Sequence, residues 1–221
     1  MEYLSTIEID PDTPAKASII WLHGLGADGN DFVPIVSELE LPDDMGVRFV
    51  FPNAPEMPVT INNGYVMPAW YDILSEDFFR KEDEEGIRNS ATRIEDLIRH
   101  EIDRGIPAYR IILAGFSQGG AIALHTGLRY RKQLAGIMAL STYLPLADTL
   151  SMERVSENDN VPVMMAHGLY DPVVPFSVAQ RSSEQLRTQG YDVELHEFEM
   201  EHTVCSAEIK AISDWIRKVL G

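Results

Sequence analysis

The strongest chemical signal in the sequence is a serine held between glycines. Gly115-Phe116-Ser117-Gln118-Gly119 directly follows an apolar run at 110–114 and precedes a helical pattern from 121. A strand, a sharp turn and a helix are the surroundings that lift a nucleophilic serine hydroxyl above the ends of a sheet. Glycines flank the serine because side chains there would collide in so tight a turn. The pattern predicts that Ser117 is the nucleophile of a serine hydrolase.

A serine hydroxyl attacks only when a base takes its proton. Six histidines are candidates: His23, His100, His125, His167, His196 and His202. In α/β-hydrolases the catalytic residues follow the chain order Ser, Asp or Glu, His, and the base follows the last strand. His100 and His125 fall in helical patterns and His196 in a strand pattern, whereas His202 precedes the final helix. We therefore expect His202 to be the base.

The acid that orients this base should lie between the two, at the end of a strand. Asp171, in His167-Gly168-Leu169-Tyr170-Asp171-Pro172, follows the apolar run 161–166. Its carboxylate would accept a hydrogen bond from the Nδ1–H of His202 and stabilise the imidazolium. Asp148 and Asp159 precede that run, at the wrong end of the strand. An Asp-Pro turn is the alternative interpretation, and chain order favours the catalytic one.

The negative oxygen of the intermediate needs backbone donors. One is the amide after the nucleophile, which belongs to Gln118. The other is expected from a loop after an early strand, and His23-Gly24-Leu25-Gly26 follows the run 17–22. The amide of Leu25 is our candidate, with the glycines allowing close approach. A glycine turn before a helix would have the same residues, so the loop supports the prediction only together with Ser117.

The elements that must position these residues alternate along the chain. Short apolar runs predict buried strands at 17–22, 47–51, 110–114, 136–140 and 161–166, and alternating segments at 3–10 and 192–198 predict two more. Helical spacing of apolar residues predicts helices at 87–102, 117–130, 177–189 and 207–220. Strands alternating with helices predict a doubly wound α/β sheet, and 221 residues suit a single domain.

One segment does not follow this alternation. Residues 52–79 contain four prolines and many apolar side chains. Prolines discourage regular structure, and a long apolar loop in a compact domain often forms a lid or a binding wall. We expect a lid-like loop here, with a meandering loop packed on the core as the alternative.

Charge and cysteine content exclude several classes of function. The chain has 18 Lys and Arg against 35 Asp and Glu, a net charge of −17, which disfavours binding to nucleic acid or anionic membranes. Its single cysteine, Cys205, has no partner for an internal disulfide and no nucleophile turn around it. The first residues do not resemble a signal peptide, and no apolar run would span a bilayer. We expect a cytoplasmic protein.

Cofactor and metal motifs are missing from the sequence. No His, Cys and carboxylate cluster has the spacing of metal ligands. No G-x-G-x-x-G follows a strand, and there is no P-loop. We expect neither a metal nor a cofactor.

Five motifs together resemble the small carboxylesterase/acyl-protein thioesterase family, also labelled phospholipase/carboxylesterase. They are Trp21-Leu22-His23-Gly24-Leu25-Gly26, Pro68-Ala69-Trp70-Tyr71-Asp72-Ile73, Gly115-Phe116-Ser117-Gln118-Gly119-Gly120, His167-Gly168 with Asp171, and His202. The resemblance covers essentially the whole chain. It implies an α/β-hydrolase fold with a mostly parallel central sheet flanked by helices and no large cap domain. One departure is Glu201, where many bacterial members have glycine before the histidine. That carboxylate would favour a charged imidazole, or would point to solvent without effect.

The resemblance also implies an activity and a site. The activity is hydrolysis of carboxyl esters with short to medium acyl chains, or of thioesters or lysophospholipids. Ser117, Asp171 and His202 would form the triad, and Leu25 and Gln118 would supply the oxyanion donors. The acyl chain would bind along the apolar segment: Met57, Val59, Met67, Trp70 and Tyr71. Relatives that pair over the site face suggest a homodimer.

Three other functions stay open. A thioesterase acting on acylated proteins would use the same triad. A peptidase of this fold would need features that hold a peptide, and none is evident. A binding protein without catalysis usually lacks a triad residue, whereas all three are present here.

Overall fold

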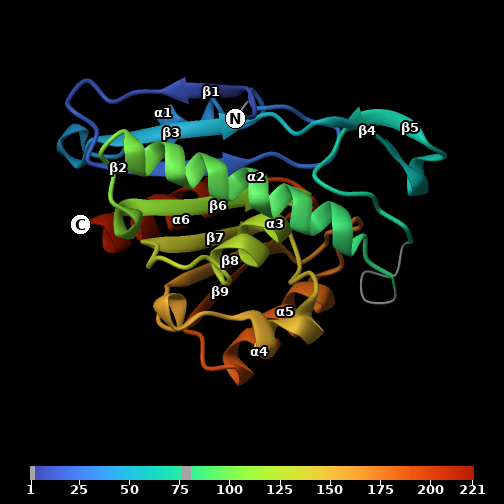
Figure 1. Ribbon diagram of the computed structural model, residues 1–221. Coiled ribbons are helices and arrows are strands. Elements are labelled where there is room, and N and C mark those ends of the chain that lie inside the picture. The colour runs from blue at the N-terminus through green and yellow to red at the C-terminus, as the bar shows by residue number, and fades with distance from the viewer. Residues whose placement is uncertain (1–2, 76–80) are drawn as a thin grey trace.

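A computed structural model describes residues 3–75 and 81–221 of the chain (Figure 1). Its centre is a seven-stranded sheet in the order β1-β3-β2-β6-β7-β8-β9. β1 pairs antiparallel with β3, and every other pair of neighbours is parallel. The strands are β1 (Thr6–Ile9), β2 (Ala17–Leu22), β3 (Val47–Pro52), β6 (Ile111–Phe116), β7 (Gly136–Leu140), β8 (Val163–Gly168) and β9 (Val193–Phe198).

The central strands are apolar because both faces of the sheet are covered. β2, β7 and β8 are buried along their whole length, as expected of parallel strands between two helical layers. All seven strand segments predicted from the sequence form strands, and the α/β-hydrolase prediction is confirmed. β8 begins two residues later than the apolar run, after Pro162, which has no N–H to donate.

Helices form the two layers. α2 (Glu84–Asp103), α3 (Gln118–Gly127), α4 (Ala147–Glu153) and α5 (Phe176–Thr188) pack their apolar sides into the core on one face. α1 (Ile35–Glu38) and α6 (Ser206–Leu220) cover the other face, and Figure 1 shows α6 behind the sheet and α2 in front. Short 3-10 helices are η1 (Asp43–Met45), η2 (Thr60–Asn62), η3 (Ala108–Arg110) and η4 (Ser156–Asn158). Within the described ranges, no helix is both long and apolar enough to cross a bilayer.

The proline-rich segment is more regular than the sequence indicates. β4 (Glu56–Val59) and β5 (Tyr65–Pro68) pair as an antiparallel hairpin that extends from the right of the sheet in Figure 1. A two-stranded hairpin leaves one edge of each strand without a partner, so Pro58 and Pro68 are tolerated. Asn63 and Gly64 close the turn with φ values of 55° and 75°. The expectation of a loop throughout 52–79 was therefore wrong for the hairpin, and residues 76–79 lie outside the described residues.

Topology brings the predicted site residues to one edge of the sheet. Parallel strands place their carboxyl ends together, where ligand sites of open α/β sheets form. The loops after β2, β6, β8 and β9 carry, in that order, Leu25, Ser117, Asp171 and His202. Residues far apart in the sequence thus converge.

His125, buried in α3, should make the stability of the fold depend on pH. Burial, together with the charges of Arg129 and Arg88, lowers the pKa of His125 from 6.5 to about 3. Between these values the unfolded chain binds a proton that the folded protein does not bind. Stability should therefore fall as the pH is lowered, by up to about 1.4 kcal/mol per pH unit from this group.

His125→Gln removes the titrating group, so its free energy of unfolding should depend less steeply on pH across that window. Urea unfolding of both proteins at a series of pH values measures the two slopes. Equal slopes would contradict the prediction.

Candidate active site

The backbone of Ser117 is strained in the turn between β6 and α3. Its φ is 53° and its ψ is −120°, a combination that non-glycine residues rarely adopt. A Cβ on Gly119 would lie 2.5 Å from the carbonyl oxygens of Leu22 and His23, and one on Gly115 would lie 2.3 Å from the carbonyl group of Gly119. Backbone therefore fills the space that side chains would need at both glycines.

Two hydrogen bonds from β7 and the loop after it hold this turn. The Ser117 amide donates to the carbonyl oxygen of Leu140 at 2.8 Å, and the hydroxyl of Thr142 donates to the Ser117 carbonyl at 2.6 Å. Both polar groups of the Ser117 backbone are fixed, which gives the side chain a defined direction.

The structure brings Ser117, His202 and Asp171 into one hydrogen-bonded chain. Ser117 Oγ lies 3.0 Å from Nε2 of His202, and Nδ1 of His202 lies 2.7 Å from Oδ2 of Asp171. Because the carboxylate accepts, Nδ1 carries the proton and Nε2 is free to receive one from the serine. This geometry is that of a serine hydrolase triad.

Asp171 is held as a buried anion. Oδ1 accepts from the amides of Val173 and Val174 at 2.8 and 2.9 Å, and Nε2 of His167 lies 3.3 Å from Oδ2. Burial alone would raise the pKa of Asp171, but hydrogen bonds from His167, His202 and the Val174 amide hold that pKa well below its ordinary range. The carboxylate therefore stays charged beside His202.

Backbone contacts lock the loop of the acid against the loop of the base. The amides of Leu169 and Tyr170 donate to the carbonyls of Phe198 and Met200 at 2.8 and 3.1 Å. A Cβ on Gly168 would lie 2.3 Å from the Met200 carbonyl oxygen, so only glycine allows this approach. The adjoining residue, Glu201, is exposed to solvent.

The loop after β2 is fixed by His23. The amide of Ala54 donates to Nε2 of His23 at 3.0 Å, so the proton is on Nδ1, which donates to the Gly24 carbonyl at 2.7 Å. Burial lowers the pKa of His23 and keeps its ring neutral. The Gly26 amide donates to the Pro68 carbonyl at 2.8 Å, which ties this loop to the hairpin. Leu25 is thereby held at the cavity that Ser117 also lines.

The side chain of Gln118 joins the nucleophile turn to the segment after the hairpin. Its Oε1 accepts from the Trp70 amide at 2.8 Å, and its Nε2 donates to the Tyr71 carbonyl at 2.7 Å. The indole N–H of Trp70 donates to the His23 carbonyl at 2.9 Å. Trp70 and Gln118 thus link both predicted oxyanion loops.

A cavity of about 850 Å³ opens at Ser117 and His202. Its lining is mostly apolar. Tyr71, Tyr143 and Val174 in this lining are buried, whereas Asp31 and Asn62 are exposed. The volume suits a small molecule or one acyl chain. No group of side chains suited to binding a metal ion occurs in residues 3–75 and 81–221.

The family described as Phospholipase/Carboxylesterase matches residues 5–220. The chain belongs to this family. It is 40% identical over 213 residues to acyl-protein thioesterase 1 of Neurospora crassa, covering 92% of this chain and 87% of that protein. The crystal structure of Zea mays acyl-protein thioesterase 2 matches with a TM-score of 0.87 at 30% identity, covering 99% and 100% of the two chains. That of Arabidopsis thaliana SOBER1 matches at 0.88 and 31%, covering 94% and 100%. This phospholipase/carboxylesterase family member is a carboxylic ester hydrolase.

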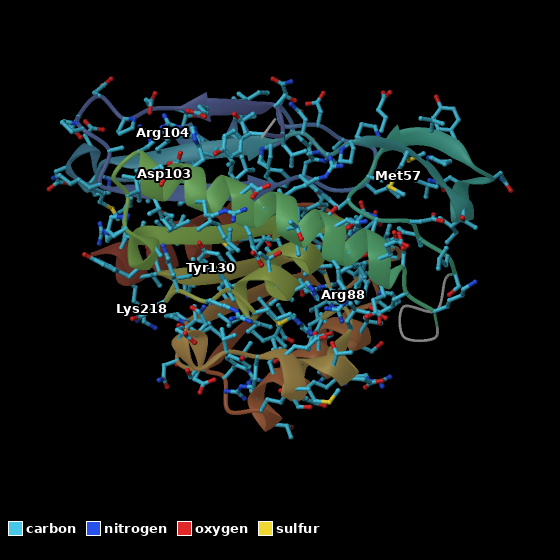
Figure 2. All side chains as sticks on the ribbon, in the orientation of Figure 1. Met57, Arg88, Asp103, Arg104, Tyr130 and Lys218 are labelled. Carbon is cyan, nitrogen blue, oxygen red and sulfur yellow. The ribbon has the colours of Figure 1, made fainter. Side chains whose placement is uncertain are left out.

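The substrate-binding prediction requires correction at four of its five residues. Of Met57, Val59, Met67, Trp70 and Tyr71, only Tyr71 is among the described residues that line the cavity. Val59 and Trp70 are buried in the core, at 0% and 1% exposure. Met57 and Met67 are partners across the hairpin, and Figure 2 shows Met57 out on it. Because the segment forms a hairpin, it reaches the cavity through other residues, Ile61 and Asn62 between the two strands and Tyr71, Ile73 and Ser75 after them.

Sequence reasoning also missed several residues that line or support the site. Tyr143 and Val174 line the cavity from the loops after β7 and β8, and His167 contacts the buried carboxylate. A usable signal was available, because loops at the carboxyl ends of parallel strands form the site.

Asp171→Asn should lower kcat of this ester hydrolase by roughly 10⁴, because a neutral amide neither fixes the tautomer of His202 nor stabilises its charged form. Steady-state kinetics on a simple ester measures the loss. The matched control is Asp148→Asn, which changes an exposed acid outside the cavity and should leave kcat as in the wild type. Equal effects of the two substitutions would contradict the role of Asp171.

Trp70→Phe removes the hydrogen bond to the His23 carbonyl, and we expect kcat to fall about fivefold to tenfold with little change in KM, as one lost hydrogen bond implies. Trp215→Phe is the control for lost volume, because the indole N–H of this buried tryptophan has no partner in the described part of the chain. The same fall in both variants would show that volume, not the bond, matters.

Proposed function

We propose that this chain is a serine carboxylesterase that hydrolyses esters with short to medium acyl chains. The observation that carries the proposal is the continuous hydrogen-bonded chain from Ser117 through His202 to Asp171 at the mouth of an apolar cavity. Ser117 is the nucleophile, His202 the base and Asp171 the group that orients it. The amides of Leu25 and Gln118 are the oxyanion donors.

The first step forms an acyl-enzyme. Nε2 of His202 takes the proton of Ser117 as Oγ attacks the ester carbonyl carbon. The carbonyl oxygen becomes negative and accepts from the amides of Leu25 and Gln118. The intermediate collapses, the bond to the alcohol oxygen breaks, and His202 gives its proton to the leaving alcohol.

The second step repeats this chemistry with water. His202 takes a proton from water, whose oxygen attacks the acyl carbon. The bond to Ser117 Oγ then breaks, and the serine regains its proton from His202. The carboxylic acid is released and the enzyme is restored.

Thioester hydrolysis on acylated proteins is the second candidate. It is favoured by the relatives named acyl-protein thioesterase, 40% and 39% identical in Neurospora crassa and Mycosarcoma maydis. The same triad would serve, with a thiolate leaving in place of an alkoxide. A cytoplasmic location and a homodimer paired over the site face stay predictions.

The decisive measurement is hydrolysis of p-nitrophenyl esters from acetate to palmitate, with matched thioesters. We expect kcat/KM to peak at short to medium oxyesters and to fall by at least about 10⁴ in Ser117→Ala. Higher kcat/KM on thioesters would favour the second candidate. A wild type that cleaves neither class would overturn the proposed function, and a Ser117→Ala variant that keeps full activity would overturn the triad.

A further inference from the structure

Two buried tyrosines form part of the wall between the active-site cavity and a smaller hollow. Tyr71, Ile73 and Tyr143 line the cavity of about 850 Å³ and also the hollow of about 10 Å³ behind it. The hollow is the size of a single water molecule. Its lining also includes the charged residues Lys81, Glu82 and Asp83.

The two phenol groups are joined directly. Their hydroxyl oxygens are 2.9 Å apart, and Tyr71 and Tyr143 are 3% and 7% exposed. Burial raises the pKa of both tyrosines, so the pair stays neutral at working pH. A neutral hydrogen-bonded pair closes this part of the wall without adding a charge to the cavity lining.

Hydrogen bonds fix the backbone at or next to both Tyr71 and Tyr143. The Tyr71 carbonyl accepts from Gln118, which follows the nucleophile. Tyr143 lies between Thr142, which donates to the Ser117 carbonyl, and Leu144, whose amide donates to the hydroxyl of Ser182 at 3.0 Å. The pair is therefore held at a set distance from Ser117.

We propose that the Tyr71–Tyr143 pair is the specificity element that limits the length of the acyl chain. The inference rests on the proposed function, since it assigns the part of the cavity lined by the buried Tyr71 and Tyr143 to the acyl group. A chain that reaches the pair meets two rings joined by a hydrogen bond, and the hollow that the described residues leave next to them has room for one water molecule and is lined in part by charged residues. Longer chains must leave methylene groups in solvent.

The test compares acyl-length profiles rather than single activities. Tyr143→Ala opens the wall, and the ratio of kcat/KM for long over short p-nitrophenyl esters should rise by about fourfold for each methylene that gains burial. Tyr143→Leu should shift the ratio in the same direction by less, and it guards against a failure of the alanine variant to fold. Tyr143→Phe keeps the ring and should keep the wild-type ratio.

Tyr130→Ala is the matched control, because it removes a tyrosine ring of similar burial that does not line the cavity. Figure 2 shows Tyr130 left of the centre of the view, away from the hairpin at the right. The ratio of kcat/KM for long over short esters in Tyr130→Ala should equal that of the wild type. A wild-type ratio in both Tyr143→Ala and Tyr143→Leu, with either variant active on acetate, would overturn the proposal.

A binding measurement separates this inference from the proposed function. Straight-chain methyl ketones of increasing length are titrated calorimetrically into Ser117→Ala and into Ser117→Ala with Tyr143→Ala or Tyr143→Leu. Affinity should stop rising at a longer chain in the double variants. If the wild type cleaves no ester, the proposed function fails, and this shift still supports the length limit. If the affinity stops rising at the same ketone length in all three proteins, the proposed length limit is overturned, whatever the activity of the wild type on esters.

Discussion

The backbone of Ser117, held at a φ of 53°, is the constraint on which the rest of this site depends. Such a conformation persists only where the surroundings determine it. Here the surroundings are β7, where the Leu140 carbonyl accepts a hydrogen bond from the serine amide, and the end of β2, where the carbonyls of Leu22 and His23 fill the space beside Gly119. The conformation of one residue thus fixes how closely two strands and a helix approach.

A second constraint is the burial of one negative charge. Desolvation disfavours a carboxylate, and Asp171 stays ionised because two amides and two histidines surround it. Those donors come from its own turn, from β8 and from the loop after β9. The interactions that keep the charge therefore also hold the loops of acid and base together, and the orientation of His202 follows from them.

The sequence predicts whatever depends on local pattern or on chain order. Buried parallel strands are apolar throughout, so their positions were clear, and the order of Ser117, Asp171 and His202 led to residues that the fold brings into contact. In the 52–79 segment, which side chains are buried in the core and which line the cavity could not be predicted in this way. Trp70 and Val59 look like candidates for a binding wall, but their burial depends on pairing across the hairpin and on a hydrogen bond to His23. The loop that carries Tyr143 was predictable, since it follows the carboxyl end of β7, but which side chain of that loop lines the cavity is set by tertiary packing.

The side chain of Gln118 connects the wall of the cavity to the turn that carries Ser117. This side chain holds the backbone of Trp70 and Tyr71, while the backbone amide of Gln118 is one of the two proposed oxyanion donors. A substrate that pushes against the cavity wall therefore also disturbs the group that must stabilise the developing charge. An ill-fitting acyl group would then be penalised twice, once when it binds and again as the tetrahedral centre forms. Selection against it would act on the rate of acylation as well as on the strength of the initial encounter.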